Sequence, residues 1–252
     1  MVAMLTLALL AAFASANLNA GPTALQSPAV TVSREIHFPA PRAIVWPPEP
    51  AAAPSPAPGL TKTVYLTFDD GPNPVSTPEI LSLLEAYGAE ASFFVIGENA
   101  KVWSALVERE ARDGDTIGDH TWSHPNLTAL PTSVAWAELA RDRNLIATLT
   151  GRSPSLWRPP YEDFNRSVVT LASGLGMTMQ LWSVSTGDWQ LPGTMVIVLR
   201  VLAALHNGMV VLFHDGGGHT RSESVAAVAI LIPELRADGY RIAALPPGGI
   251  GG

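Results

Sequence analysis

Short apolar runs alternate with longer amphipathic stretches from residue 62 onward. Runs with the length and apolar content of buried strands occupy residues 64–68, 91–96, 116–119, 156–158, 179–184, 209–214 and 240–245. The stretches between them repeat apolar residues every three or four positions, which predicts helices at 77–87, 100–113, 133–150, 166–175, 194–206 and 222–238. Such alternation is typical of parallel strands joined by helical crossovers, and it predicts an α/β fold, either a barrel or a doubly wound sheet.

Glycines mark the ends of the predicted helices. One glycine lies just beyond each amphipathic stretch, at Gly88, Gly114, Gly151, Gly176, Gly208 and Gly239. Glycine is favoured there because the residue after a helix often takes a left-handed conformation.

The first 61 residues differ in composition from the rest of the chain. Residues 1–16 form an apolar run that ends in Ala-Ser-Ala, which favours a signal peptide over the alternative of an apolar terminal helix packed on the domain. Residues 17–61 are rich in Pro and Ala and predict an extended linker, with a short strand at 30–38. We therefore expect a folded domain at 62–252 and no stable membrane span, because 16 residues fall short of the roughly 20 that a span needs.

Composition excludes several classes of site. The net charge of −7 gives no reason to expect nucleic acid or an anionic membrane as a partner. The chain has no cysteine, so disulfides, thiolate metal sites and cysteine nucleophiles are excluded. A metal would have to be held by His, Asp, Glu, backbone oxygen or water.

Polar side chains gather at the ends of five predicted strands. The segments that follow or finish these strands are D-D-G-P at 69–72, H-T-W-S-H at 120–124, R-P-P-Y at 158–161, S-T-G-D-W at 185–189 and L-F-H-D at 212–215. In parallel α/β folds the carboxyl ends of the strands meet at one side of the sheet, where active sites are built. The pattern therefore indicates an active site there.

His120 and His124 have a spacing that suits metal chelation. Residues four apart on a helical turn face the same way, so two imidazoles can bind one ion. Taken alone, the pair is more often two surface or capping histidines. An aspartate from another strand end, such as Asp70, would complete a His-His-carboxylate set.

Asp69 and Asp70 are adjacent carboxylates, and their like charges repel each other. A strand-ending turn, supported by Gly71-Pro72, is the simpler interpretation when the segment is taken alone. Considered together with the two histidines, a metal site is favoured. A metal bound at Asp70 would offset the repulsion and leave Asp69 free to act as a base.

These segments, in this order, resemble the motifs of polysaccharide deacetylases with a NodB homology domain, also called carbohydrate esterase family 4. The resemblance rests on T-F-D-D-G-P, H-T-W-S-H, R-P-P-Y, D-W and L-F-H, and it extends over roughly residues 62–246. It implies a distorted (β/α) barrel with about seven parallel strands and a catalytic domain at 62–252. It also implies a divalent metal, usually zinc, and the removal of acetyl groups from polymers that contain N-acetylglucosamine.

The resemblance also implies roles for single residues. Asp70, His120 and His124 would bind the metal. Asp69 would be the general base and His214 the general acid.

Further roles are implied for residues around these five. Arg158 would hold Asp69 in position, and the backbone N–H of Tyr161 would stabilise the oxyanion. Asp188 would belong to the polar network behind Arg158 or His214. Trp189 and Leu212 would line the substrate groove, together with Tyr161.

Each supporting residue also has a structural interpretation. Arg158 could be a surface ion-pairing residue and Tyr161 a loop residue on the rim. Trp189 and Leu212 could be core, which we favour for Trp182. The remaining candidates are assigned structural places: Asp215 to a turn or cap, and His206 and His219 to the surface.

Two positions depart from the family pattern. The fourth motif usually begins with aspartate, and here Ser185 stands at that position. If that aspartate tunes the acid histidine, the acid step would be weaker unless Asp188 or Asp215 compensates. Glu162 replaces the usual glycine after Tyr161, and its charge would narrow the groove or disfavour anionic substrates.

The sequence therefore predicts a metal-dependent polysaccharide N-deacetylase, secreted or associated with the cell envelope. The expected substrate and partner is peptidoglycan or a chitin-like oligomer, the expected metal is Zn²⁺, with Co²⁺, Ni²⁺ or Mn²⁺ as alternatives, and the expected state is a monomer. An acetylxylan O-deacetylase and a catalytically weak carbohydrate-binding pseudoenzyme remain alternatives. A metalloprotease of the H-E-x-x-H type ranks last, because Thr121 stands where the glutamate would be.

Overall fold

The structure is a computed structural model that describes residues 62–218 and 220–250. The predicted signal segment at 1–16, the linker at 17–61 with its strand at 30–38, and His219 lie outside the described residues. No helix among the described residues is long and apolar enough to cross a membrane.

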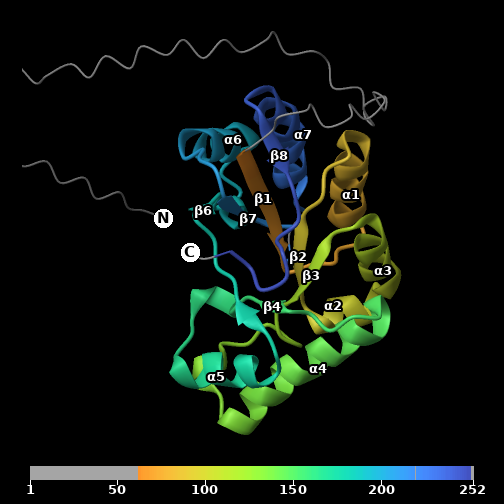
Figure 1. Ribbon diagram of the computed structural model, residues 1–252, viewed down its shortest axis with the longest axis vertical. Helices are drawn as coiled ribbons and strands as arrows, with labels where there is room; N and C mark the ends of the chain where they lie inside the picture. The colour runs from red at the N-terminus through yellow and green to blue at the C-terminus, as the bar shows by residue number, and fades with distance from the viewer. Residues whose placement is uncertain (1–61, 219, 251–252) are drawn as a thin grey trace, which may run out of the picture. The chain divides into compact units, whose positions relative to one another are not determined.

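Strands and helices alternate through the described domain (Figure 1). The strands are β1 (Lys62–Asp69), β2 (Ser92–Val95), β3 (Thr116–Asp119), β4 (Leu156–Trp157), β5 (Thr178–Met179), β6 (Val184–Ser185), β7 (Met209–His214) and β8 (Tyr240–Ile242). The α-helices are α1 (Ser76–Tyr87), α2 (Gly97–Val102), α3 (Ser104–Asp113), α4 (Thr132–Thr150), α5 (Arg166–Gly174), α6 (Thr194–Ala203) and α7 (Ser222–Ala237). Three short 3₁₀ helices are η1 (Leu127–Ala129), η2 (Pro160–Glu162) and η3 (Asp188–Gln190).

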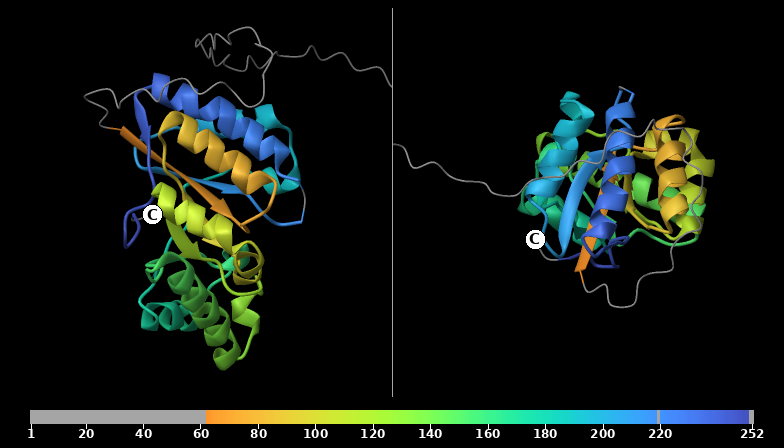
Figure 2. Two further views of the ribbon diagram at one scale, coloured as in Figure 1. Left: turned by 90° about the vertical axis from the view of Figure 1, so that its right-hand side faces the viewer. Right: turned by 90° about the horizontal axis from the view of Figure 1, so that it is seen from above.

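The strands form one parallel sheet in the order β5-β4-β3-β2-β1-β7-β6. β8 pairs with the first residues of β1, on the side where β2 pairs with its last residues. These seven strands curl into a half-barrel whose outer face is covered by helices (Figure 2). The distorted (β/α) barrel expected from the sequence is therefore confirmed.

The core lies between the sheet and the helices that cover it. Phe68 of β1 stacks on Phe93 of β2 and Phe213 of β7, with ring centroids 5.2 and 5.6 Å away. All three rings are fully buried, and each contributes about 1.5–3 kcal/mol through the apolar surface it removes from water. A smaller cluster around Trp157 and Leu139 packs under α4 and α5.

Two predicted elements are wrong in their extent. The helix predicted at 100–113 is two helices, because Trp103 leaves the helical region with φ −115° and ψ 42°. The strand predicted at 179–184 is two strands, β5 and β6, which lie at opposite ends of the sheet. Residues 180–183 cross between those ends. The guanidinium of Arg158 donates to the carbonyl oxygens of Gln180 at 2.9 Å and Leu181 at 3.3 Å.

Three predicted helix ends are confirmed with their glycine caps, at Gly88, Gly114 and Gly151, whereas the helix predicted at 194–206 already ends at Ala203. All six glycines placed at predicted helix ends have positive φ, between 54° and 100°. Gly88 closes α1 in this way, and its N–H reaches back to the carbonyl oxygen of Glu85.

Candidate active site

A groove of about 690 Å³ lies at the carboxyl ends of the strands. Its lining residues are Asp69, Asp70, His120, His124, Pro159, Tyr161, Glu162, Trp182, Ser185, Trp189, Leu212, His214, Gly217 and Arg221. The structure therefore brings most of the predicted site residues into one cavity, although they are spread over more than 140 positions in the chain.

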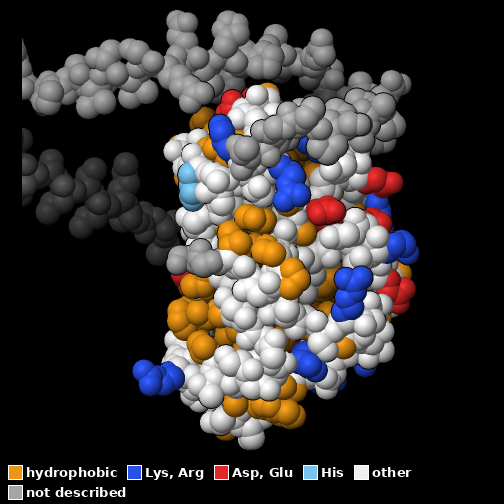
Figure 3. Space-filling view, in the orientation of Figure 1, with side chains coloured by type: hydrophobic (Ala, Val, Ile, Leu, Met, Phe, Trp, Pro, Cys, Tyr) orange, Lys and Arg blue, Asp and Glu red, His pale blue; other side chains and the backbone are white. Residues whose placement is uncertain are grey.

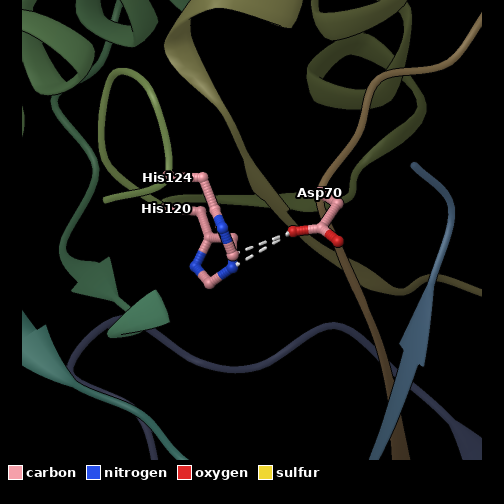
Figure 4. Close-up of side chains that lie close together, drawn as sticks. All are labelled: Asp70, His120 and His124. Atoms are coloured by element: carbon pink, nitrogen blue, oxygen red, sulfur yellow. Dashed lines mark ion pairs between the residues drawn. The ribbon is translucent and has the colours of Figure 1, made fainter. Parts of the chain in front are cut away.

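Asp70, His120 and His124 form a cluster at this groove (Figure 4). One ligand atom from each residue lies within 4.8 Å of the others. The Nε2 atoms of His124 and His120 lie 3.2 and 3.5 Å from Asp70 Oδ1. Asp70 Oδ1 is buried and has no hydrogen-bond partner among the described residues. Two imidazole nitrogens around a buried free carboxylate oxygen fit a divalent cation well.

The segment that carries the two histidines is tightly held. The residues Thr121 and His124 have φ of 69° and 58°, so the loop is not a regular helical turn. The ring Nδ1 of His120 lies 2.8 Å from the carbonyl oxygen of Arg158. Because a carbonyl only accepts, the proton must be on Nδ1, which leaves the Nε2 lone pair facing Asp70.

Helix α4 supplies the other partners of this loop. Glu138 accepts from the Ser123 N–H at 2.8 Å through its side chain and from the Trp122 N–H at 3.1 Å through its backbone. Asp142 Oδ2 accepts from the His120 N–H at 3.2 Å, and burial raises the pKa of Asp142. The backbone N–H groups of 120–124 are each satisfied, which fixes the loop before any ligand binds.

The residues of the cluster shift one another's pKa values. Burial works to raise the pKa of Asp70, but the neighbouring imidazoles, His120 foremost, outweigh it and lower the pKa. Burial works to lower the pKa of His120, but the nearby carboxylates of Asp69 and Asp70 raise it. For His124, burial and the charge of His120 lower the pKa. Asp70 is thus kept ionised, as a metal ligand must be.

Asp69 faces a different partner from Asp70. It is the last residue of β1, and its Oδ1 accepts from Arg158 Nη1 at 2.7 Å. Arg158 is fully buried, so it is no surface residue, and its Nη1 also donates to Thr67 Oγ1 at 2.9 Å. The other oxygen of Asp69 lies 3.9 Å from His120 Nε2. Asp69 is therefore oriented with one oxygen on the arginine and one toward the cluster.

His214 lies opposite Asp69, because β1 and β7 pair these two residues in register. Its Nδ1 is 2.7 Å from Asp188 Oδ1, and its backbone N–H donates to Asp188 Oδ2 at 2.9 Å. Burial would lower the pKa of His214, but the hydrogen bond and charge of Asp188 raise it. Asp188 thus belongs to the network of His214 rather than to that of Arg158.

The rim of the groove carries the aromatic residues. Tyr161 in η2 has φ 60° and 69% exposure, and its hydroxyl donates to the carbonyl oxygen of His124 at 3.3 Å. The Tyr161 backbone N–H donates no hydrogen bond within the described residues. Trp189 is 54% exposed, whereas Leu212, which also lines the groove, is buried. Glu162 and the exposed Ser185 also line the groove.

One structural interpretation made from the sequence needs correction, and a second gains detail. Trp182, which we assigned to the core, lines the groove while it packs against the cluster of Leu156 and Leu245. Asp215 does follow β7 in a bend, but it is fully buried, and burial raises its pKa to about 7. Its Oδ2 accepts from Thr77 Oγ1 at 2.5 Å and so ties the start of α1 to the bend after β7. His206 is exposed, as predicted.

Sequence motifs did not single out every residue of the site. Arg221 lines the groove, and Ser224 donates from its hydroxyl to Asp188 Oδ2 at 2.6 Å. Both lie at the start of α7, far along the chain from the other residues of the site. No spacing in the sequence therefore indicates that they belong to it.

A family model for polysaccharide deacetylases matches residues 57–180. A chitooligosaccharide deacetylase of Sinorhizobium fredii is 38% identical over 194 residues, which cover 73% of this chain and 90% of that protein. The chain belongs to the polysaccharide deacetylase family. A peptidoglycan-N-acetylglucosamine deacetylase of Bacillus cereus is 37% identical over 73% of this chain and 86% of its own length. The solved structure of a family 4 carbohydrate esterase from Streptomyces lividans superposes with a TM-score of 0.69 at 31% identity, over 74% of this chain and 94% of that one.

Membership of this family agrees with the geometry of the groove. The family model ends at residue 180, whereas the superposition includes about three quarters of the chain, close to the extent of the described domain. The structural similarity therefore extends over more of the chain than the family model does.

Proposed function

We propose that the chain is a metal-dependent N-deacetylase that removes acetyl groups from N-acetylglucosamine units of peptidoglycan or chitin oligomers. One observation carries the proposal: a partly buried Asp-His-His cluster lies in the same groove as Asp69, which pairs with Arg158, and His214, which pairs with Asp188. The groove thus offers a metal site, a base and an acid within one substrate-sized space.

The metal would be held by Asp70, His120 and His124, and the buried free oxygen of Asp70 supports this assignment. A divalent ion bound there would polarise the acetyl carbonyl and lower the pKa of a water molecule, which is the chemistry that such ions supply. Zn²⁺ is the expected ion, and Co²⁺, Ni²⁺ and Mn²⁺ suit the same ligands.

Asp69 would accept the proton of the attacking water. Its second oxygen points toward the cluster at 3.9 Å from His120 Nε2, so a water near the cluster is within its reach. Arg158 fixes the carboxylate from behind through the 2.7 Å ion pair.

His214 would donate a proton to the amine nitrogen as the C–N bond breaks. An amide needs this step because an unprotonated amine anion is a poor leaving group. The raised pKa of His214 favours the protonated ring, and Asp188 on Nδ1 leaves Nε2 as the donor. The carboxylate of Asp188 thus contacts His214 although Ser185 stands at the first position of the fourth motif.

Three residues would shape the groove for a sugar. The unused N–H of Tyr161 would stabilise the oxyanion. Trp189 would form a wall against a sugar ring, and Leu212 would contact the acetyl methyl group.

Acetate release by the purified protein tests this function. We would offer N-acetylated chitooligosaccharide, peptidoglycan and acetylxylan in parallel, with and without added Zn²⁺, and use Asp69→Asn as the blank. Metal-dependent acetate from an amino sugar is the expected result. Acetate from xylan alone would make the protein an O-deacetylase. No acetate from any of the three, with metal bound, would make it a carbohydrate-binding pseudoenzyme.

We further propose that the protein acts outside the cytoplasm, as secreted or envelope-associated protein. The apolar run at 1–16 and the Pro/Ala-rich segment at 17–61 support this, and so do relatives named for peptidoglycan. Fractionation of expressing cells, followed by N-terminal sequencing of the exported protein, would locate it and show whether cleavage follows Ala16. The same material on a sizing column would test the expected monomer.

A further inference from the structure

Ser224 contacts the acid side of the site from a helix that carries none of the family motifs. It is the third residue of α7 and is 1% exposed. Its hydroxyl donates to Asp188 Oδ2 at 2.6 Å. The same oxygen accepts from the His214 backbone N–H at 2.9 Å, which leaves Asp188 Oδ1 for His214 Nδ1.

Asp188 needs an external partner because its own segment is short. It begins the three-residue helix η3, and the flanking residues Gly187 and Leu191 are both left-handed. Such a segment has no long hydrogen-bond ladder to hold a side chain in place. The orientation of the carboxylate therefore depends on its contacts with β7 and α7.

Helix α7 is well suited to act as the fixed partner. Its buried face packs into the main core through Val225, Ala227, Val228, Leu231, Ile232 and Leu235. Residues at its start also bond two neighbouring segments of the chain. Arg221 Nε donates to the Gly216 carbonyl oxygen at 2.5 Å, and Glu223 accepts from the Gly193 N–H at 2.8 Å.

We propose that Ser224 is a positioning residue that sets the orientation of the Asp188–His214 pair. With Oδ2 held by Ser224 and the His214 N–H, the carboxylate presents Oδ1 to the imidazole, and Nε2 is aimed at the groove. The charged groups that face His214 are Asp188 from η3 and Asp69 and Asp70 from the end of β1. The inference rests on the proposed function, because the pair matters only if His214 acts as the acid.

The test compares an amide substrate with an activated ester. We would measure kcat and KM of wild type, Ser224→Ala and Ser224→Thr on N-acetylchitooligosaccharide and on 4-nitrophenyl acetate. Ser222→Ala is the matched control, because Ser222 lies in the same turn but is exposed. In Ser224→Ala we expect kcat on the amide to fall on the order of tenfold, with KM little changed and the ester rate within about twofold. Ser224→Thr, which keeps the hydroxyl, should restore most of the amide rate.

An amide-to-ester ratio in Ser224→Ala within about twofold of wild type would overturn the proposal, even if both rates fell together. A second measurement does not require turnover. It follows the low-field proton NMR resonance of His214 Nδ1–H, which is assigned by its loss in His214→Gln. It should broaden or disappear in Ser224→Ala and persist in Ser224→Thr and Ser222→Ala. If wild type releases no acetate, the proposed function has failed, and this resonance alone decides whether Ser224 orients the pair.

Discussion

At the scale of single residues, Asp69 and Asp70 are neighbours in the chain but face different partners. Asp70 has φ 70°, a left-handed conformation that is uncommon for aspartate. The turn directs Asp70 toward two histidines, while Asp69 stays on the arginine. Asp69 therefore has the guanidinium of Arg158 as its positive partner, and a metal held at Asp70 would offset the remaining repulsion.

Asp69→Asn should separate catalysis from metal binding. The amide keeps the shape and loses the basic oxygen, so we expect turnover to fall by about 10²–10⁴-fold. Metal content, measured by elemental analysis after dialysis, should stay close to wild type. Asp70→Asn is the matched change and should lose metal as well. Wild-type turnover in Asp69→Asn would remove Asp69 as the base.

Asp188→Asn should change the pH dependence of the amide reaction. Asp188 raises the pKa of His214, so its removal lowers that pKa. A general acid works while protonated, and the rate falls as the pH rises through its pKa. The alkaline fall of kcat should therefore begin at a pH lower by about one unit or more in Asp188→Asn.

Ser185→Ala is the control for this measurement, because Ser185 lines the same groove without bonding to His214. Its profile should follow wild type. An alkaline limb that stays in place in Asp188→Asn would show that His214 does not set it.

At the scale of elements, α4 acts as the support of the histidine loop. Two of its turns contact the loop, through Glu138 and Asp142. Groups that orient metal ligands commonly affect affinity by 10–100-fold when they are removed.

Glu138→Ala should therefore weaken metal binding by about tenfold or more, measured by isothermal titration of the metal-free protein with Zn²⁺. Glu138→Gln keeps an acceptor oxygen and should lie between the alanine variant and wild type. His124→Ala, which removes a proposed ligand, sets the limit of full loss. Equal affinity in Glu138→Ala and wild type would show that the loop holds its shape without α4.

Elements also show what the sequence could and could not predict. The motifs placed Asp70, His120 and His124 correctly at strand ends, because strand ends of a parallel sheet converge whatever the details of the loops. The apolar run at 179–184 was predicted as one strand, because periodicity does not show that its two ends pair with opposite sheet edges. Ser224 carries no motif, and its contact with Asp188 depends on how α7 packs.

At the scale of the whole molecule, the domain buries several carboxyl groups away from the groove. Glu110 in α3 is fully buried, and neither of its side-chain oxygens has a partner among the described residues. Burial raises its pKa well above the usual value, and burial also raises the pKa of Asp115 to about 7. For an acid whose pKa is raised on folding, the stabilising effect is complete at low pH and is lost as the pH rises through the folded pKa.

Glu110→Gln should remove the loss of stability that Glu110 causes at high pH. We expect the variant to resemble wild type at pH 4 and to be more stable by about 1 kcal/mol or more at pH 8, because no buried charge has to form. Urea unfolding at both pH values measures the difference. Glu108→Gln, exposed on the same helix, should change neither value by more than about 0.5 kcal/mol. A variant less stable than wild type at pH 8 would contradict the expectation.

The pairing of β1 with β7 places Asp69 directly opposite His214. Neighbouring strands lie about 4.8 Å apart whatever side chains they carry, so the backbone ladder sets the spacing of the two residues. The aromatic core beneath them, around Phe68 and Phe213, can therefore be repacked without moving the proposed base and acid apart, provided the register is kept. Substitutions that tune the stability of this fold and substitutions that tune its chemistry fall on largely separate positions, so the two properties are free to evolve independently.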